Sequence, residues 1–201
     1  GQPVTARPGE TILKAAQRHG VEIPHLCYSD GLRPDGNCRA CVVEIAGERT
    51  LAPSCCRAPT PGMKVQAASP RARKSQQMVV EMLLSDMPDM GYRWNDEQKN
   101  TPELIAGSAY PESARGQFDS KTPESTGQHG ELSEWATRLG VAVRPALKAL
   151  RRQQPAPDLS HPAMAVNLDA CIQCNRCVRA CREEQVNDVI GYALRGAESK
   201  I

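Results

Sequence analysis

The chain has 201 residues and a formal net charge of +2, and aromatic residues make up only 3% of it. A charge so close to neutral gives no support for nucleic-acid binding, and no run of about 18 apolar residues offers a membrane span. The length allows one domain or two small ones. With few large side chains for a core, a small domain usually needs a disulfide or a metal to stabilise it, and nine cysteines are available.

The first part of the chain predicts a compact α+β domain over residues 1–85. A strand is expected at residues 4–6 and a short helix at residues 10–19, which Gly20 ends. The apolar spacing of that helix places one set of side chains inward, namely Ile12, Leu13, Ala15 and Ala16. Residues 26–41 are rich in Gly, Pro, Asp and Asn, which predicts a loop.

The same domain continues with a predicted hairpin and a second helix. Residues 42–46 and 49–52 predict the two strands of the hairpin, and residues 63–65 a further short strand. Ser69 followed by Pro70 is a typical helix start. The spacing of four apolar residues predicts the buried face of this helix, made of Met78, Val79, Met82 and Leu83.

Residues 86–159 predict a long connector with short helices. Its first part is dominated by Pro, Ser, Gly, Asn, Asp and Glu, and candidate helices follow at residues 132–139 and 145–152. Five basic residues here are expected on a solvated face, with subunit docking as the alternative. They are Arg138, Arg144, Lys148, Arg151 and Arg152. A second small module is expected over residues 160–201.

The first cysteine group reads Cys27-x10-Cys38-x2-Cys41-x13-Cys55. Thiolates suit both iron–sulfur centres and zinc, but the loop CYSDGLRPDGNCRAC can wrap a cluster. Its Gly31, Gly36 and Asn37 let backbone N–H groups turn toward sulfur, and such hydrogen bonds tune the potential of a cluster. One distant fourth cysteine is typical of a plant-type 2Fe-2S site.

Two neighbouring residues leave alternatives open at this first group. Cys55 and Cys56 are adjacent, and because successive side chains on an extended segment alternate in direction, only one of them is expected to bind. His25 stands two residues before Cys27. A Rieske-type site would need a second histidine nearby, so a structural role or a hydrogen bond to the site is the better interpretation of His25.

The second cysteine group is the run Cys171-x2-Cys174-x2-Cys177-x3-Cys181, which is typical of bacterial-type 4Fe-4S ferredoxins. Four cysteines in so short a span do not easily reach disulfide geometry, and zinc sites rarely use this spacing. In two-cluster ferredoxins the fourth cysteine of such a run binds the other cluster. Either all four cysteines bind one cluster, or Cys181 serves a neighbouring cluster.

Two segments resemble parts of one known subunit. HLCYSDGLRPDGNCRACVVEIAGERTLAPSCCRAPTPGMKV resembles the N-terminal 2Fe-2S domain of the large (alpha) subunit of cytosolic NAD-dependent Mo/W formate dehydrogenases. SHPAMAVNLDACIQCNRCVRACREEQVNDVIGYA resembles the first half of the two-cluster ferredoxin module of the same subunit. The resemblance implies a plant-type ferredoxin-like (β-grasp) domain, then the connector, then a partial 4Fe-4S ferredoxin-type domain. It also aligns Cys55 with the fourth ligand of the first cluster.

The resemblance extends to the large subunit of NADH dehydrogenase and to the electron-transfer subunit of NAD-reducing hydrogenases. Those relatives carry an extra cluster, bound by one His and three Cys, just after the helix that ends near Leu84. The corresponding segment here, LLSDMPDMGYRWNDEQKN, contains no His or Cys, which favours formate dehydrogenase. The alternatives are an NAD-reducing hydrogenase or NADH dehydrogenase-type subunit, a stand-alone ferredoxin-like carrier and, more weakly, a zinc-binding interaction module.

The resemblance further implies how such a segment works. It would pass electrons between a Mo- or W-pterin formate site outside this segment and a flavin/NAD-binding beta subunit. A small 2Fe-2S gamma subunit is expected as a further partner, and the complex is expected in the cytoplasm. No residue here is expected to be catalytic, because the sequence places no catalytic constellation around His129, His161 or Lys148; each is expected to be a surface or packing residue. A first strand is expected before Gly1, and a second cysteine run and the remainder of the catalytic subunit after Ile201.

Overall fold

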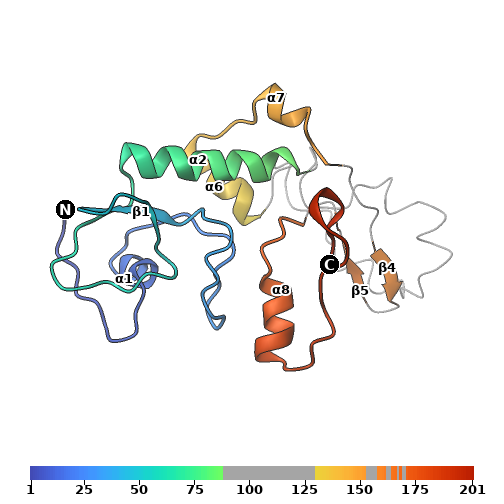
Figure 1. Ribbon diagram of the computed structural model, residues 1–201, viewed down its shortest axis with the longest axis horizontal. Helices are drawn as coiled ribbons and strands as arrows, with labels where there is room; N and C mark the ends of the chain where they lie inside the picture. The colour runs from blue at the N-terminus through green and yellow to red at the C-terminus, as the bar shows by residue number, and fades with distance from the viewer. Residues whose placement is uncertain (88–129, 153–157, 162–163, 167, 169–170) are drawn as a thin grey trace, which may run out of the picture.

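A computed structural model describes residues 1–87, 130–152, 158–161, 164–166, 168 and 171–201. In Figure 1 the N-terminal α+β part lies at the left, the helix α8 (Arg176–Arg179) of the C-terminal cysteine run stands beside it near the middle, and helix α2 (Pro70–Ser85) runs along the top of the N-terminal part. Most of the predicted connector, including His129, lies outside the described residues.

Helix α1 spans Ile12–Arg18 and confirms the first predicted helix, shortened at both ends. It begins where the Thr11 side chain accepts a hydrogen bond from the backbone N–H of Lys14, 3.3 Å away. Gly20, at φ +73°, follows its end. The predicted strand at residues 4–6 is wrong: this segment is exposed and belongs to none of the described sheets, so its backbone has no neighbouring strand to bond.

Three short strands form one antiparallel sheet with the order β2-β1-β3. Strand β1 (Val42–Ile45) pairs with β2 (Ala52–Pro53), and this confirms the predicted hairpin pairing with a longer connecting loop. On its other edge β1 pairs with β3 (Val65–Gln66), which begins two residues later than predicted. The central strand is nearly all buried, so it supplies the sheet's contribution to the core.

Helix α2 confirms the predicted start at Ser69, whose side chain accepts a hydrogen bond from the N–H of Ala72. The predicted buried face is right for two of its four residues: Val79 and Leu83 are half-buried and pack against the apolar cluster between α2 and α6, whereas Met78 is 48% and Met82 is 60% exposed. The buried side chains are rotated around the helix axis and include polar ones; they are Ala72, Gln76, Val80, Glu81 and Ser85. The Gln76 amide donates to the carbonyls of Val42 and Ala67, at 2.9 and 3.0 Å, and so ties the helix to the sheet.

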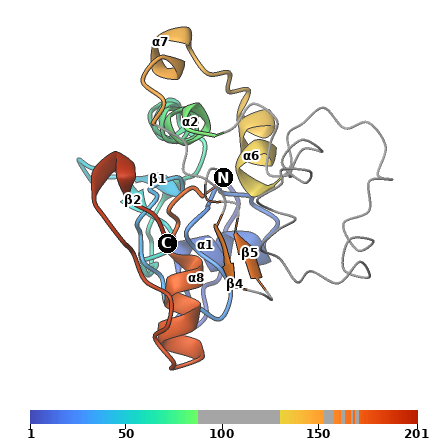
Figure 2. The ribbon, with the colours of Figure 1, turned by 90° about the vertical axis from the view of Figure 1, so that its right-hand side faces the viewer.

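Two further helices lie against α2 (Figure 2). Helix α6 (Glu131–Leu139) confirms its prediction and ends at Gly140, in the left-handed region at φ +64°. Helix α7 (Pro145–Lys148) is only one turn long, where residues 145–152 were predicted. Arg144, expected on a solvated face, makes a bidentate ion pair with Glu81 of α2.

The C-terminal part is made of short elements. Strands β4 (Asp158–His161) and β5 (Met164–Val166) pair in antiparallel fashion. Helix α8 (Arg176–Arg179) continues into a π-helical turn, η2 (Ala180–Glu184), and a 3-10 turn, η3 (Gly196–Glu198), lies close to the end of the chain.

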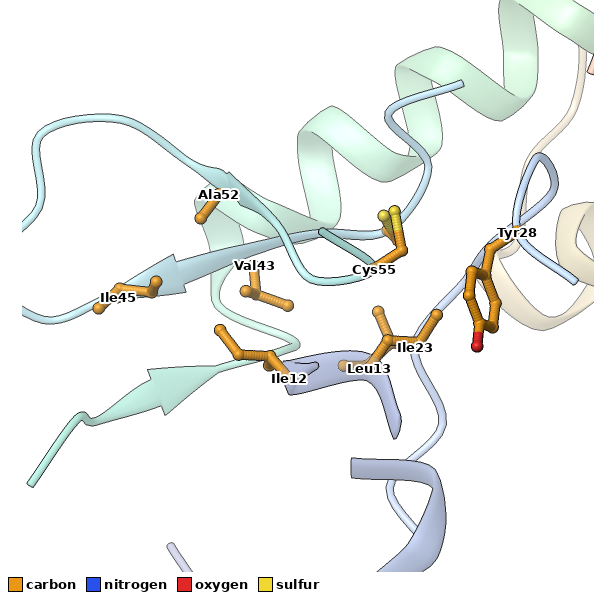
Figure 3. Packing of buried hydrophobic residues seen from close by; sticks show 9 residues of the cluster. Ile12, Leu13, Ile23, Tyr28, Val43, Ile45, Ala52 and Cys55 are labelled. Atoms are coloured by element: carbon orange, nitrogen blue, oxygen red, sulfur yellow. The ribbon is translucent and has the colours of Figure 1, made fainter. Parts of the chain in front are cut away.

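The buried residues form two hydrophobic clusters. The first core joins α1 to the sheet and contains two cysteines; its members are Ile12, Leu13, Ile23, Tyr28, Cys41, Val43, Ile45, Ala52 and Cys55 (Figure 3). The second core joins α2 and α6, and its buried members are Leu26, Ala40, Val80, Met87, Leu132, Ala136 and Leu139. Cys38 and Ile172 pack against the second core, so it contacts both cysteine groups. Among the described residues, no helix is long and apolar enough to cross a bilayer.

Candidate metal centres

The first cysteine group is assembled from a loop and the sheet. Cys27 and Cys38 come from the two ends of the predicted loop, Cys41 immediately precedes β1, and Cys55 follows β2. Cys27, Cys41 and Cys55 are buried and Cys38 is half-buried. Figure 3 shows Cys55 within the core, between Val43 and Tyr28 and above Leu13 and Ile23. The fold therefore brings all four predicted residues together.

The four thiols lie close enough to shift one another's pKa values. Cys27 interacts with Cys38 and Cys55, and Cys55 interacts with Cys41. Two backbone hydrogen bonds also join Cys27 and Cys38: each residue's N–H donates to the other residue's Sγ, and both N···S distances are 3.5 Å. No three His, Cys, Asp or Glu side chains within the described ranges are arranged to hold a single metal ion.

Backbone N–H groups line these sulfurs, as the sequence predicted for Asn37. The N–H groups of Asn37 and Cys38 donate to the Cys27 sulfur, and that of Ala40 donates to the Cys38 sulfur. The turn that allows this includes Arg39 in the left-handed region, at φ +59°. Because such donors favour the ionised form of an acceptor, the loop is built for thiolates.

Proton sharing among the thiols shifts their pKa values in opposite directions. Hydrogen bonds from Cys38 and Cys55 lower the pKa of Cys27 to about 2, and a bond from Cys55 lowers the pKa of Cys41 to about 6. The same interactions with Cys27, together with burial, raise the pKa values of Cys38 and Cys55. Thiols must lose their protons to bind metal, and the lowered pKa values of Cys27 and Cys41 favour that loss.

Cys56 differs from its neighbour in exposure. Its side chain is exposed, and its Sγ lies 3.5 Å from the Cys55 Sγ, on the side away from the core. Gly36, at φ +64°, passes so close that a Cβ atom there would lie 2.9 Å from the Cys56 sulfur. Gly36 is therefore needed both for its backbone conformation and for this close approach.

His25 lies beside the first group without joining it. Its Nδ1 is 2.8 Å from the carbonyl oxygen of Ile23, and its ring packs against those of Tyr28 and Trp135, with each pair of ring centroids 6.1 Å apart. These contacts agree with the structural role that the sequence favoured for this histidine.

The second cysteine group is divided into three cysteines and one. Cys177 has a pKa raised by burial and by the nearby charges of Cys174 and Cys171. Burial and then the charges of the same three cysteines raise the pKa of Tyr192 to about 12. The backbone between them turns through left-handed conformations at Gln173 and Asn175, and the N–H of Gln173 donates to the Cys171 sulfur at 3.4 Å.

Cys181 has a different set of partners. Its thiol donates to the Asn187 side-chain oxygen at 2.8 Å and accepts from the N–H of Val189 at 3.3 Å. The residue is buried, whereas the other three are half-buried or exposed. Cys181 thus has surroundings separate from those of the other three cysteines.

Comparison with known families assigns the N-terminal part to a class. Residues 1–70 match the family described as "2Fe-2S iron-sulfur cluster binding domain", and all four cysteines of the first group lie in the matched range. The N-terminal part is therefore a domain of the 2Fe-2S cluster-binding class.

The whole chain is similar to particular oxidoreductase subunits. It is 29% identical to the mitochondrial NADH dehydrogenase (ubiquinone) iron-sulfur protein 1 of Solanum tuberosum over 201 residues, which is 100% of this chain and 23% of that protein. It is 29% identical to the NADP-reducing hydrogenase subunit HndD of Solidesulfovibrio fructosivorans, over 98% of this chain and 29% of that protein. The chain thus spans less than a third of either relative.

A solved structure shares the fold. The chain aligns with one from a structure titled "Crystal structure of NAD+-reducing NiFe-hydrogenase in the H2-reduced state", with a TM-score of 0.67 and 24% identity. The alignment covers 99% of this chain and 70% of that one. At this identity the likeness concerns the fold, and it extends through the C-terminal part.

Several residues around the two cysteine groups were not predicted from the sequence. Tyr192 and Asn187 lie beyond the cysteine run, where no spacing rule points to them. Arg179 lies inside the run, and its burial depends on a contact with the distant first loop. Gln76 could have been found by asking why a polar residue interrupts the apolar stripe of α2.

Proposed function

We propose that the chain is an iron–sulfur electron-relay segment of an NAD-linked oxidoreductase. The observation that carries this proposal is the set of four cysteines, three of them buried, that the loop and the sheet bring together with backbone N–H groups facing sulfur, within the range that matches the 2Fe-2S domain family. A bound 2Fe-2S cluster would supply one-electron transfer at a low potential, typically about −400 mV for the plant type.

The ligands proposed for that cluster are Cys27, Cys38, Cys41 and Cys55. Cys27 and Cys38 are joined by reciprocal N–H···S contacts, and Cys55 interacts with both Cys27 and Cys41, so all four thiols belong to one group. Burial of Cys55 and exposure of Cys56 support Cys55 as the fourth ligand. The chain's contribution is to orient the thiolates, to donate N–H groups to them and to exclude water.

The proposed second centre is a 4Fe-4S cluster held by Cys171, Cys174 and Cys177. The separate surroundings of Cys181 support its assignment to a neighbouring cluster, as in two-cluster modules. The three thiols with Tyr192 beside them then form one half of a paired module.

The kind of complex is the finer part of the proposal. Similarity to NADH dehydrogenase and hydrogenase subunits supports a segment of one of those complexes. Formate dehydrogenase is the second candidate, supported by the lack of His and Cys in residues 83–100, and it would add a Mo- or W-pterin site outside this segment. In either case we propose a flavin- and NAD-binding partner subunit and a cytoplasmic location.

The test is reduction of the clusters in the complete native complex, followed by electron paramagnetic resonance at low temperature. Dithionite should produce a 2Fe-2S signal and a 4Fe-4S signal, and NADH should produce at least the former. If dihydrogen is the only other reductant that reduces the clusters, the complex is a hydrogenase. If formate is the only other one, the complex is a formate dehydrogenase. A colourless protein that binds zinc would contradict the relay proposal.

A further inference from the structure

One arginine connects the two cysteine groups from within the second run. Arg179 stands between Cys177 and Cys181 and is only 3% exposed. Its two terminal guanidinium nitrogens donate to the carbonyl oxygens of Cys27 and Arg33, both in the loop of the first group. The helix that carries one proposed cluster is therefore bonded to the backbone of a proposed ligand of the other.

The remaining nitrogen of this side chain faces a carboxylate. Nε of Arg179 lies 3.9 Å from Oδ2 of Asp35 and makes no hydrogen bond. The cation is thus oriented, with its forked end toward Cys27 and its Nε toward Asp35. Burying a guanidinium is costly unless acceptors surround it, so this position requires the first loop to stay in place.

Weaker contacts surround Arg179 at the same junction. The Asn37 amide donates to the carbonyl of Gln173 at 3.4 Å, and Arg33 pairs with Glu183 at 3.3 Å. Both involve exposed side chains, so they contribute little by themselves. Arg179 is the buried contact of this junction within the described part of the chain.

We propose that Arg179 is a positioning residue that fixes the two clusters relative to each other and makes the first cluster easier to reduce. The inference rests on the proposed relay function. Reduction adds one electron, and so one negative charge, to the first cluster. A fixed positive charge bonded to the carbonyl of its ligand Cys27 favours that added charge, because net charge and surrounding dipoles set the potential of such clusters.

The test is a potentiometric titration, followed by electron paramagnetic resonance, of the full chain purified with its clusters. Arg179→Met removes the cation and keeps an apolar side chain of similar length. At a fixed ambient potential the ratio of reduced to oxidised first cluster should fall about tenfold, a shift of about 59 mV for a one-electron couple. The matched control is Arg182→Met, which removes an equal charge from the same turn, where Arg182 pairs with exposed Asp188.

Positioning is measured separately by hydrogen exchange of residues 29–37 and by the magnetic interaction between the two reduced clusters. Arg179→Met should speed exchange and weaken the interaction. Arg179→Lys keeps the charge but lacks the fork, so it should restore much of the potential and little of the protection from exchange. Arg182→Met should leave both measurements unchanged.

Asp35→Asn gives an independent arm if the Arg179→Met chain fails to assemble its first cluster. Removing this carboxylate should make the first cluster easier to reduce, opposite to the effect of Arg179→Met. Equal shifts in the Arg179 and Arg182 variants, or a shift toward harder reduction in Asp35→Asn, would overturn the inference. Absence of any iron–sulfur signal in the unsubstituted chain would instead contradict the proposed function.

Discussion

The two cysteine groups have different support from the rest of the chain. The first is embedded in a core, where Cys41 and Cys55 are as buried as Leu13 and Val43. The second has the denser spacing in sequence, yet its first three cysteines are half-buried or exposed and sit on short turns. Dense spacing and a supporting scaffold are therefore independent properties of a metal site.

This difference separates what each group needs from its surroundings. Cysteines spread over residues 27–55 converge only if the α1 helix, the sheet and the loop have folded, so their arrangement depends on tertiary structure. Cysteines 171–177 converge through local turns at Gln173 and Asn175. We expect mutations in the first core to affect the first centre more than the second.

The largest effect is expected from Cys38→Ser. Loss of one proposed ligand should abolish the 2Fe-2S signal and spare the 4Fe-4S signal, because the two ligand sets share no residue. Electron paramagnetic resonance of the reduced protein measures both signals in one sample. Loss of both signals would show that the two groups do not assemble independently, so that the second group also depends on the fold around the first.

A smaller effect is expected from Leu13→Ala, which opens a cavity in the first core. Leu13 is fully buried, and such a substitution costs about 2–5 kcal/mol of stability. Urea unfolding followed by the visible absorption of each cluster should show the first centre lost at a lower urea concentration, and the second changed less. Met82→Ala on the exposed side of α2 is the control and should change neither midpoint.

Gly36→Ala should weaken the first centre alone. The positive φ costs an alanine about 1–2 kcal/mol, and its Cβ would meet the Cys56 sulfur. Thermal unfolding of the purified chain measures the loss. Adding Cys56→Ala should recover the part due to the contact and leave the part due to the backbone; full recovery would show that the backbone conformation carries no cost.

The smallest effect is expected from Cys56→Ser. The exposed thiol lies outside the core, so the 2Fe-2S signal should keep its shape and intensity. Cys55→Ser is the comparison variant and should lose that signal. If the outcomes are exchanged, the fourth ligand is Cys56, and the burial of Cys55 serves packing only.

Local signals in the sequence predicted the elements that depend on them. Ser69 and Pro70 mark the start of α2 because capping is decided by neighbouring residues. The buried face of α2 was predicted only in part, with Val79 and Leu83 right and the two methionines wrong. Apolar spacing alone ignores Gln76 and Glu81, whose partners lie on the sheet and beside α7. The strand expected at residues 4–6 lacks a partner among the described strands, and pairing is a property of the whole sheet.

In the candidate sites, too, the sequence predicted the features that depend on neighbouring residues and missed those that depend on distant partners. The spacing of the cysteines predicted all eight candidate ligands, and the composition of the loop predicted the N–H groups that face Cys27. The separation of Cys181 from the other three depends on Asn187 and Val189, which no spacing rule includes. The bond from Arg179 to the Cys27 carbonyl joins residues far apart in the chain, so only the folded molecule reveals it.

The second core has a consequence for the order of events during synthesis. Leu26 and Ala40 border the first cysteine group, and they pack on Leu132 and Ala136 of α6, which the ribosome makes much later. The N-terminal domain therefore leaves the ribosome with one apolar side of its cysteine loop uncovered.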